Sequence, residues 1–524
     1  MKIRKLHRQQ ALDVLQTIEE AQENNAFQIA QDGIEALLDF VDSLYNEDTE
    51  LANLLAKHYE LLYKASIGEV KIKVLRKHFL SIKNIILNDF KQNHIEIAFL
   101  PHISSAASAL ESIYHAANED PDCDAYWIPV PYYHGAEPEK MILEGQEHYP
   151  NIPCVSLEDY NIEERRPDAI FTFYTYERNN LVNLSDNLLL QNLKHLTDML
   201  VWVPYYVDVD EYAYTNTSIN HPCYLHVHKA ILGTETQRDI IINGYTEKNK
   251  TFFEIKQNLA IATEIQQKLV INEFAKMYEN TSQDSSIEEF FKEYETIFMD
   301  PNEKFVAMGS PMYDKVLTTT KEDCKLPKEW ANIIKNKQVI IFISSVGMLS
   351  RCTNRNYLEY TVSTLSTFQK RDDVILWWRP HPAMEMALKS NPTSLAAYKR
   401  IVRTYKSGGW GIYDDTGDLH RAIAWGDGLY GDTSSVMVLY QVTGKPIMMA
   451  NTCGELYEKM KRCYTKLGGV RFEDEQDTLE QFIDDIVTGK FAGSSPTMIP
   501  NAGKNIYSYI KSLVIPIRIL KNTN

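Results

Sequence analysis

The sequence predicts an α/β protein with two parallel-sheet domains that follow an all-α region. Apolar residues recur at helical spacing from the N-terminus to about residue 90. From Ile95 onward, short apolar strands alternate with helical stretches, and the alternation starts again after residue 325. Strands that alternate with helices in this way form parallel sheets. We therefore expect a helical region at 1–92, a first sheet domain at 93–310, and a second at 311–524 that includes the C-terminal helices.

Composition and charge exclude several classes of protein. The chain of 524 residues is 44% apolar and 24% charged, which is typical of a globular domain in water. Its net charge of −17 argues against a general nucleic-acid binder, which carries a basic surface. The seven cysteines form no CxxC pair, so we expect free thiols in a reducing compartment.

Neither end of the sequence resembles a membrane-spanning segment. The basic N-terminus lacks the apolar core of a signal peptide, and no stretch reaches the roughly 20 apolar residues that cross a bilayer. We expect a cytoplasmic protein. The apolar C-terminal segment at 506–522, which also carries Lys511 and Arg518, is expected to pack on its own domain. Peripheral contact with the inner membrane face is the alternative.

The N-terminal region shows three helical stripes and no cluster of catalytic residue types. A bundle that serves packing or homo-oligomerisation is the interpretation that fits best. The stripes consist of Leu12, Leu15, Ile18 and Ala21; of Ile29, Ile34, Leu37, Leu38, Val41 and Leu44; and of Leu51, Leu54, Leu55, Tyr59, Leu61 and Leu62.

Five strands are expected in the first sheet domain, and their carboxyl ends are where parallel sheets bind ligands. The strands begin near residues 95, 124, 167, 199 and 229, with a helix expected at 177–196 and further helices at 252–297. The candidate site residues at these ends are His102, Ser104, Tyr132, Tyr133, Tyr174, Tyr176, Tyr205, Tyr206 and Asp208.

The functions of Asp208 and of the pair His226 and His228 in this domain each have two possible interpretations. Asp208 begins an acidic cluster that is either a solvated loop or the source of a general base. His226 and His228 would share one face if they lay on a strand, a spacing that suits a metal ion. No third ligand is evident, so we predict no metal site.

In the second sheet domain, the strand VILWW ends in Arg379-Pro380-His381. The planar guanidinium of Arg379 suits a phosphate, and His381 is placed to donate a proton to a bridging phosphate oxygen. A plain strand-end turn explains the same residues equally well.

A second strand of this domain ends in Asp432, Thr433, Ser434 and Ser435, and a helical pattern follows. One such residue is enough to cap a helix, whereas four contiguous polar side chains favour an anion site. Ser310 and the Ser344–Ser345 pair also follow short strands, and either could line the same site. The absence of a GxGxxG or Walker A motif argues against a nicotinamide cofactor or P-loop nucleotide chemistry, and we predict no cofactor.

These motifs together resemble the CDP-glycerol glycerophosphotransferase family, the teichoic-acid primases and polymerases. The resemblance covers about residues 228–452 and is carried by HKAILGTETQRDIIINGY, FVAMGSPMYDKVL, QVIIFISS, WWRPHP and GDLHRAIAWGDGLYGDTSSVMVLYQVTGKPIMMAN. The family pattern there is an R-x-H-P strand end followed by a T-D-Y-S-S-V-M helix start. It implies a GT-B fold, with two Rossmann-like domains facing a cleft, an acceptor side at 93–310 and a nucleotide-donor side at 311–524.

The resemblance also implies roles for individual residues. His381, Asp432, Ser434 and Ser435 would contact the donor nucleotide and its phosphates, with Arg379 beside them. Two positions depart from the pattern: this chain has Gly431 where the family often has Thr, and Thr433 where the family has Tyr. A larger departure lies in the first domain, where VWVPYYVDVDEY lacks the family's W-H-G-T histidine. Either His102 or Asp208 then acts as the catalytic base on the acceptor, or the acceptor chemistry differs from that of the family.

The function implied is the transfer of glycerol phosphate, or a related alditol phosphate, from a CDP-activated donor to a hydroxyl of a glycan or polyol-phosphate acceptor of the cell surface. A nucleotide-sugar glycosyltransferase on the same fold is the alternative within the enzymes. A catalytically degenerate member that only binds a nucleotide or a partner is the alternative outside them.

Overall fold

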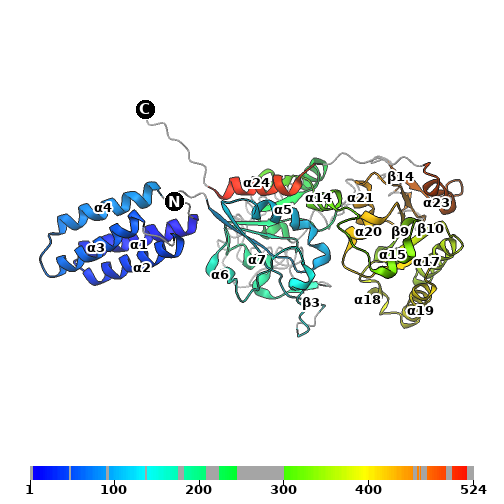
Figure 1. The fold of residues 1–524 in the computed structure, drawn as a ribbon, viewed down its shortest axis with the longest axis horizontal. Helices are drawn as coiled ribbons and strands as arrows, with labels where there is room; N and C mark the ends of the chain where they lie inside the picture. Colours follow the sequence, from blue (N-terminus) through cyan, green and yellow to red (C-terminus); the bar gives the residue numbers. More distant parts are fainter. Residues whose placement is uncertain are drawn as a thin grey trace, which may run out of the picture.

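The computed structural model describes residues 4–45, 49–89, 94–135, 139–174, 182–207, 223–244, 300–452, 457–458, 461, 469–490 and 499–515. A helical bundle, a first sheet unit and a second sheet unit follow one another along the long axis of the molecule (Figure 1). Within these residues the predicted fold class is confirmed: two parallel sheets of the GT-B type follow an all-α region. The predicted helices at 252–297 and Asp208 lie outside the described part.

The N-terminal bundle contains four helices with a common apolar core. They are α1 (Lys5–Glu23), α2 (Phe27–Tyr45), α3 (Glu50–Ser66) and α4 (Ile72–Asp89). The predicted stripes supply much of this core, including Leu15, Ile34 and Leu55, whereas Ile29 and Tyr59 of the same stripes are exposed. Gly33 allows α2 to approach α1 closely, because a Cβ at this position would lie 2.6 Å from Cγ1 of Ile18.

The bundle is tied to the first sheet by a buried arginine. Arg4, just before α1, donates through Nε to Asp168 Oδ2 at 3.0 Å, and its Nη1 lies 3.2 Å from Glu96 Oε2. All three side chains are almost completely buried. Charges removed from water in this way are stable only when they are paired, so the contact fixes the start of the bundle on the sheet.

The first sheet has six parallel strands in the order β2-β1-β4-β6-β7-β8. The strands are β1 (Ile95–Phe99), β2 (Cys123–Trp127), β4 (Ala169–Thr172), β6 (Met199–Trp202), β7 (Lys229–Leu232) and β8 (Phe305–Ala307). The helical elements are η1 (Ser104–Ala106), α5 (Ser108–Asn118), η2 (Gln146–His148), α6 (Ile162–Arg165), η3 (Asp186–Leu188), α7 (Leu190–Leu193), α9 (Cys223–His226), α13 (Pro301–Lys304) and α14 (Pro311–Thr318).

The prediction of a helix at 177–196 is wrong for most of the described residues in this range. Strand β5 (Val182–Leu184) pairs antiparallel with β3 (Tyr132–His134), and only the single turn α7 is α-helical. Ser185 hydrogen-bonds Asn187 through its side chain. Such local bonds of Ser, Asp and Asn favour turns over helix.

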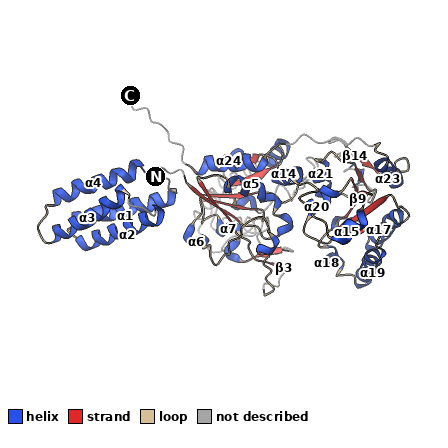
Figure 2. Ribbon diagram, viewed as in Figure 1, coloured by secondary structure: helices blue, strands red, loops and turns tan. Residues whose placement is uncertain are grey.

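The second sheet has six parallel strands in the order β11-β10-β9-β12-β13-β14. The strands are β9 (Gln338–Ser344), β10 (Val374–Pro380), β11 (Ile412–Tyr413), β12 (Gly428–Gly431), β13 (Ile447–Met449) and β14 (Val470–Phe472). The helices are α15 (Lys328–Ile334), α16 (Val346–Arg351), α17 (Asn354–Gln369), α18 (Met384–Leu388), α19 (Pro392–Gly408), α20 (Leu419–Trp425), α21 (Ser435–Gln441) and α23 (Leu479–Val487). Helices flank both sheets (Figure 2).

The C-terminal helix α24 (Ala502–Val514) returns to the first sheet unit and lies along α5 (Figure 1). Asp314 of α14 accepts hydrogen bonds from the backbone N–H groups of Ala502 and Gly503, and Lys511 reaches Asp120 at the end of α5. The helical part of this segment therefore packs on the protein, as expected, but mainly against the first sheet unit rather than on its own predicted domain at 311–524.

Cysteine usage differs from the prediction at one position. Four cysteines (123, 154, 223 and 324) are free thiols. Cys352 is disulfide-bonded, so the expectation that every cysteine is free is wrong.

Candidate active site

The strand order of the second sheet places its ligand edge between β9 and β12. From β9 the chain runs first through β10 to β11 on one side, and then through β12 to β14 on the other. This is the order of dinucleotide-binding Rossmann sheets, which bind ligands outside the carboxyl ends of the strands where the direction reverses. The residues that follow those two ends are Ser345 and Asp432.

Ser345 and Asp432 are joined directly. The Ser345 backbone N–H donates to Asp432 Oδ1 at 2.9 Å, and the Ser345 hydroxyl donates to Oδ2 at 2.5 Å. Asp432 is completely buried. The structure thus brings together two of the predicted donor-site residues, with Asp432 positioning Ser345 across the reversal point.

The hydroxyl residues after Asp432 form the start of α21. Ser434 is the N-cap, and its Oγ accepts a hydrogen bond from Val436 N at 3.3 Å. Thr433 is half-buried and Ser435 is exposed. Neither hydroxyl is hydrogen-bonded to another described residue. Thr433 and Ser435 are therefore able to turn their hydroxyls toward a ligand.

Arg379, at the end of β10, is held by a buried carboxylate. Its Nη1 donates to Asp414 Oδ2 at 2.6 Å, and its Nη2 donates to Thr416 O at 2.7 Å. Asp414 is fully buried and also accepts from Trp377 Nε1. The positive charge of Arg379 is thus already balanced by the carboxylate of Asp414. Part of the role of Arg379 is therefore to shape the loop that follows β11. Sequence reasoning missed Asp414, although an acidic pair after a strand is a detectable signal.

His381 lies just beyond Arg379 and is exposed. Its Nδ1 accepts a hydrogen bond from Ala383 N at 3.1 Å. A neutral imidazole with an occupied Nδ1 carries its proton on Nε2, so the ring presents one N–H donor. Partial removal of water from the ring lowers the pKa of His381. Because β9 lies between β10 and β12, Ser344 and Ser345 separate this loop from Asp432.

His102 lies at the corresponding reversal point of the first sheet, between β1 and β4. Its ring packs 4.6 Å from that of Phe173 and 5.4 Å from that of Tyr174, measured between ring centroids. Burial lowers the pKa of His102 to about 3. The imidazole is therefore neutral at pH 7 and is a weak proton acceptor.

Glu144 is a residue at this edge that sequence reasoning missed. Its Oε2 accepts from the backbone N–H of Ser104 at 2.6 Å, and its Oε1 accepts from the Tyr132 hydroxyl at 2.9 Å. Ser104 follows β1 and also approaches the second sheet unit: a Cβ built on Gly417 would lie 3.8 Å from Ser104 Oγ. The loop that Arg379 shapes thus meets the carboxyl edge of the first sheet.

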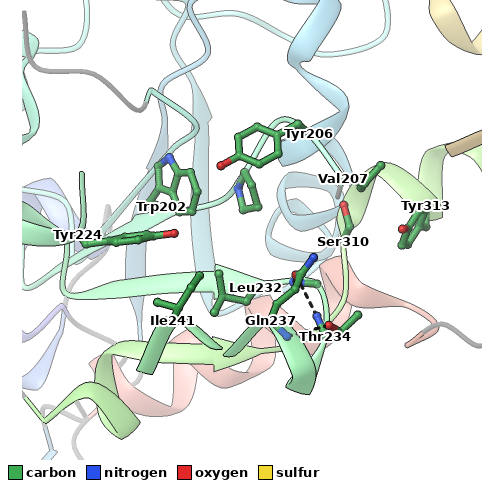
Figure 3. Close-up of a pocket in the computed structure, with 12 residues that line it drawn as sticks. Trp202, Tyr206, Val207, Tyr224, Leu232, Thr234, Gln237, Ile241, Ser310 and Tyr313 are labelled. Atoms are coloured by element: carbon green, nitrogen blue, oxygen red, sulfur yellow. Dashed lines mark hydrogen bonds between the residues drawn. The ribbon is translucent and has the colours of Figure 1, made fainter. Parts of the chain in front are cut away.

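Ser310 occupies a different place from the other predicted donor residues. It lines a small pocket at the carboxyl ends of β6 and β7, together with Trp202, Tyr224 and Gln237 (Figure 3). None of the residues between Arg379 and Ser435 lines this pocket.

His226 and His228 do not lie on a common strand. His226 ends the short helix α9, and His228 Nδ1 accepts from Leu200 N at 2.8 Å. In the part of the chain that the structure describes, no three His, Cys, Asp or Glu side chains gather in a way that would hold a metal ion. No helix in the same part is both long and apolar enough to cross a bilayer.

Comparison with known proteins gives a family match and several distant structural neighbours. Residues 249–495 match the family model of CDP-Glycerol:Poly(glycerophosphate) glycerophosphotransferase. Among curated proteins, no relative matches the chain.

Three solved structures that resemble the chain are remote from it in sequence. A variant of the wall teichoic acid polymerase TagF is 14% identical, with 85% of this chain and 98% of that chain covered and a TM-score of 0.40. S. aureus MnaA with UDP is 10% identical, with coverage of 80% and 97% and a TM-score of 0.46. The UDP-GlcNAc 2-epimerase of Methanocaldococcus jannaschii is 11% identical, with coverage of 80% and 100% and a TM-score of 0.45.

The family match is the finding that bears on function, and it spans the strand-end motifs of Arg379–His381 and Asp432–Ser435. Residues 249–495 therefore match the CDP-glycerol glycerophosphotransferase family, as those motifs predicted, and this match supports an enzyme that resembles a CDP-glycerol glycerophosphotransferase.

Proposed function

We propose that the protein transfers glycerol phosphate, or a related alditol phosphate, from a CDP-activated donor to a hydroxyl of a teichoic-acid-type or other cell-surface glycan acceptor. The observation that carries the proposal is the position of the Ser345–Asp432 pair at the strand reversal of a Rossmann-type sheet. The family match over the same residues supports a CDP-linked donor.

The donor pyrophosphate would lie at the edge formed by the ends of β9, β10 and β12. The hydroxyls of Thr433 and Ser435 and the Nε2–H of His381 are the donors that would meet its oxygens. Negative charge grows on the leaving CMP as the bond between the two phosphates breaks, and donors fixed in place before the reaction stabilise that charge. Arg379 would contribute through its N–H groups that Asp414 and Thr416 leave unused.

Acceptor binding is assigned to the side formed by residues 93–310, and donor binding to residues 311–524. The approach of Gly417 to Ser104 supports a reaction centre where the two sides meet. Asp208 and His102 were the predicted bases. Of the described residues, Glu144 fits that role better than His102, because the low pKa of His102 makes its imidazole a weak base.

Location and assembly belong to the same proposal. An acceptor that is anchored in the membrane while it is being synthesised would bring the enzyme to the cytoplasmic face of that membrane. The four-helix bundle, which stands apart from both proposed sites, is the part of the chain available for homo-oligomer contacts (Figure 1).

Calorimetry with CDP-glycerol, UDP-GlcNAc and CMP tests the donor, and release of CMP in the presence of a glycerol-phosphate acceptor tests turnover. We expect CDP-glycerol to bind more tightly than UDP-GlcNAc, and His381→Ala to weaken that binding by about 10- to 150-fold, the loss of one hydrogen bond to a charged group. Preference for UDP-GlcNAc would assign a glycosyltransferase instead, and binding without CMP release would assign a degenerate member.

The base is tested separately. Glu144→Gln is expected to lower kcat by at least about 100-fold, the usual contribution of general base catalysis, while CDP-glycerol binding stays unchanged. An unchanged kcat would remove Glu144 from the mechanism without affecting the donor assignment.

A further inference from the structure

The pocket around Ser310 lies outside the proposed donor site. Its walls include the rings of Trp202 and Tyr224 and the side chains of Leu232 and Ile241, and Ser310 and Gln237 supply polar groups (Figure 3). Pockets that combine apolar walls with a few converging polar groups are typical of small-ligand sites.

The Ser310 hydroxyl points to a ligand because it is buried without a partner. Ser310 is 3% exposed, and its Oγ has no hydrogen-bond partner among the described residues. It precedes α14, yet its side chain does not cap that helix. A buried hydroxyl left unpaired costs about 1–3 kcal/mol, and a ligand hydroxyl would remove that cost.

Gln237 adds a second directed group. Its Oε1 accepts from Gly233 N at 2.8 Å and from Thr234 N at 3.2 Å, while Thr234 Oγ1 accepts from Gln237 N at 3.1 Å. This reciprocal capping arrangement fixes which end of the amide faces the backbone. The other end, the Nε2 amide, is turned toward Ser310 (Figure 3).

Charge and size narrow the class of ligand. No residue that lines the pocket is charged, so a phosphate would find no countercharge there. The pocket encloses about 40 Å³, which is room for about three water molecules. A whole sugar ring greatly exceeds that volume, whereas the end of a small neutral polyol fits it, with its C–H groups against the aromatic rings and its hydroxyls at Ser310 and Gln237.

We propose that this pocket binds the neutral glycerol unit of one of the two substrates, an inference that rests on the proposed function. Helix α14 begins beside Ser310 and packs against α21, whose start carries Ser434 and Ser435. Ser310 and the proposed phosphate site thus lie at the starts of two helices that pack against each other. The glycerol unit belongs either to the donor or to the end of the acceptor chain.

Ser310→Ala tests the site, because this change removes no hydrogen bond within the described protein. Its matched control is Ser108→Ala, since Ser108 also has a buried and unpartnered hydroxyl but does not line the pocket. Glycerol binding to the full chain is measured by saturation-transfer NMR titration. We expect Ser310→Ala to raise the dissociation constant about fivefold, the equivalent of one neutral hydrogen bond, and Ser108→Ala to leave it unchanged.

Equal glycerol affinity in the wild type and in Ser310→Ala, or no saturable binding, would overturn the site. Steady-state kinetics then assign the source: a raised KM for CDP-glycerol identifies the donor's glycerol, and a raised KM for the acceptor identifies the acceptor's. Unchanged values of both would also overturn the proposal. Because the NMR titration needs no turnover, it separates failure of the pocket from failure of the proposed function.

Discussion

Asp432 accepts two hydrogen bonds from Ser345, one from its backbone N–H and one from its hydroxyl, across the point where the strand order of the second sheet reverses. Asp432→Ala leaves both donors unpaired in a buried place, at a cost of about 1–3 kcal/mol for each unsatisfied group. We expect chemical denaturation to show a free energy of unfolding lowered by about 2–6 kcal/mol.

Ser345→Ala removes only the hydroxyl bond and is the matched comparison, with an expected loss of about 1–2 kcal/mol. Both variants should bind CDP-glycerol more weakly than the wild type. Stability and donor binding equal to those of the wild type in Asp432→Ala would show that the pair has no organising role.

Gly431 fits only as glycine because the end of β12 lies against β9. A Cβ at this position would lie 2.3 Å from the carbonyl oxygen of Ile343. Gly431→Thr, which restores the side chain common in the family, is expected to destabilise the protein by more than about 3 kcal/mol through displaced backbone, measured as a lowered Tm.

Gly417→Ala is the control for this change, since its Cβ would make contacts of 3.8 Å, an ordinary van der Waals distance. We expect its Tm to stay within about 2 °C of the wild-type value. A similar Tm for Gly431→Thr and the wild type would mean that β12 and β9 can move apart without loss of stability.

The buried imidazole of His102 is expected to make the stability of the protein depend on pH. Its pKa of about 3 in the folded protein is below the usual value of 6.5. As the pH falls below 6.5, the unfolded chain takes up a proton that the folded chain does not bind, so stability decreases. At pH 5 this difference amounts to about 2 kcal/mol.

His102→Phe keeps an aromatic ring against Phe173 and removes the titrating group. Denaturation curves between pH 7.5 and 4.5 should show that the variant loses less stability on acidification, by up to about 1.4 kcal/mol per pH unit. Parallel pH profiles for the variant and the wild type would contradict the burial of a neutral imidazole at this position.

Arg4 and Lys5 are adjacent residues that are expected to contribute very different amounts to stability. Arg4→Ala leaves the buried carboxylates of Glu96 and Asp168 without this partner and should cost about 3–5 kcal/mol. The ion pair of Lys5 with Asp198 is about half exposed, and such pairs contribute about 0–1 kcal/mol. Thermal unfolding of Arg4→Ala and Lys5→Ala should therefore differ clearly, and equal effects would contradict the anchoring role of Arg4.

The fold class was predictable because parallel strands buried on both faces are nearly continuous apolar runs. The run from Val374 to Trp378 and the run before Ser345 read as strands for this reason. The neighbours of each strand were not predictable, because register and order depend on contacts between distant residues. Sequence alone did not reveal that β9 lies between the Arg379 loop and Asp432.

The same limit applies to the site. Arg379 was identified by residue type, but its partner Asp414 lies 35 residues further on and changes its role from a free cation to a paired one. Glu144 belongs to no motif, and only folding brings it to Ser104 and Tyr132. Ser310 was recognised as a strand-end serine, whereas its pocket is formed by side chains from three other segments.

A crystal structure of the full chain with CDP bound tests the central claim most directly. The account predicts that the diphosphate lies at the carboxyl ends of β9, β10 and β12, with phosphate oxygens within hydrogen-bond distance of His381 Nε2 and of the Thr433 or Ser435 hydroxyl. Nucleotide density elsewhere, or a diphosphate that contacts none of these residues, would contradict it.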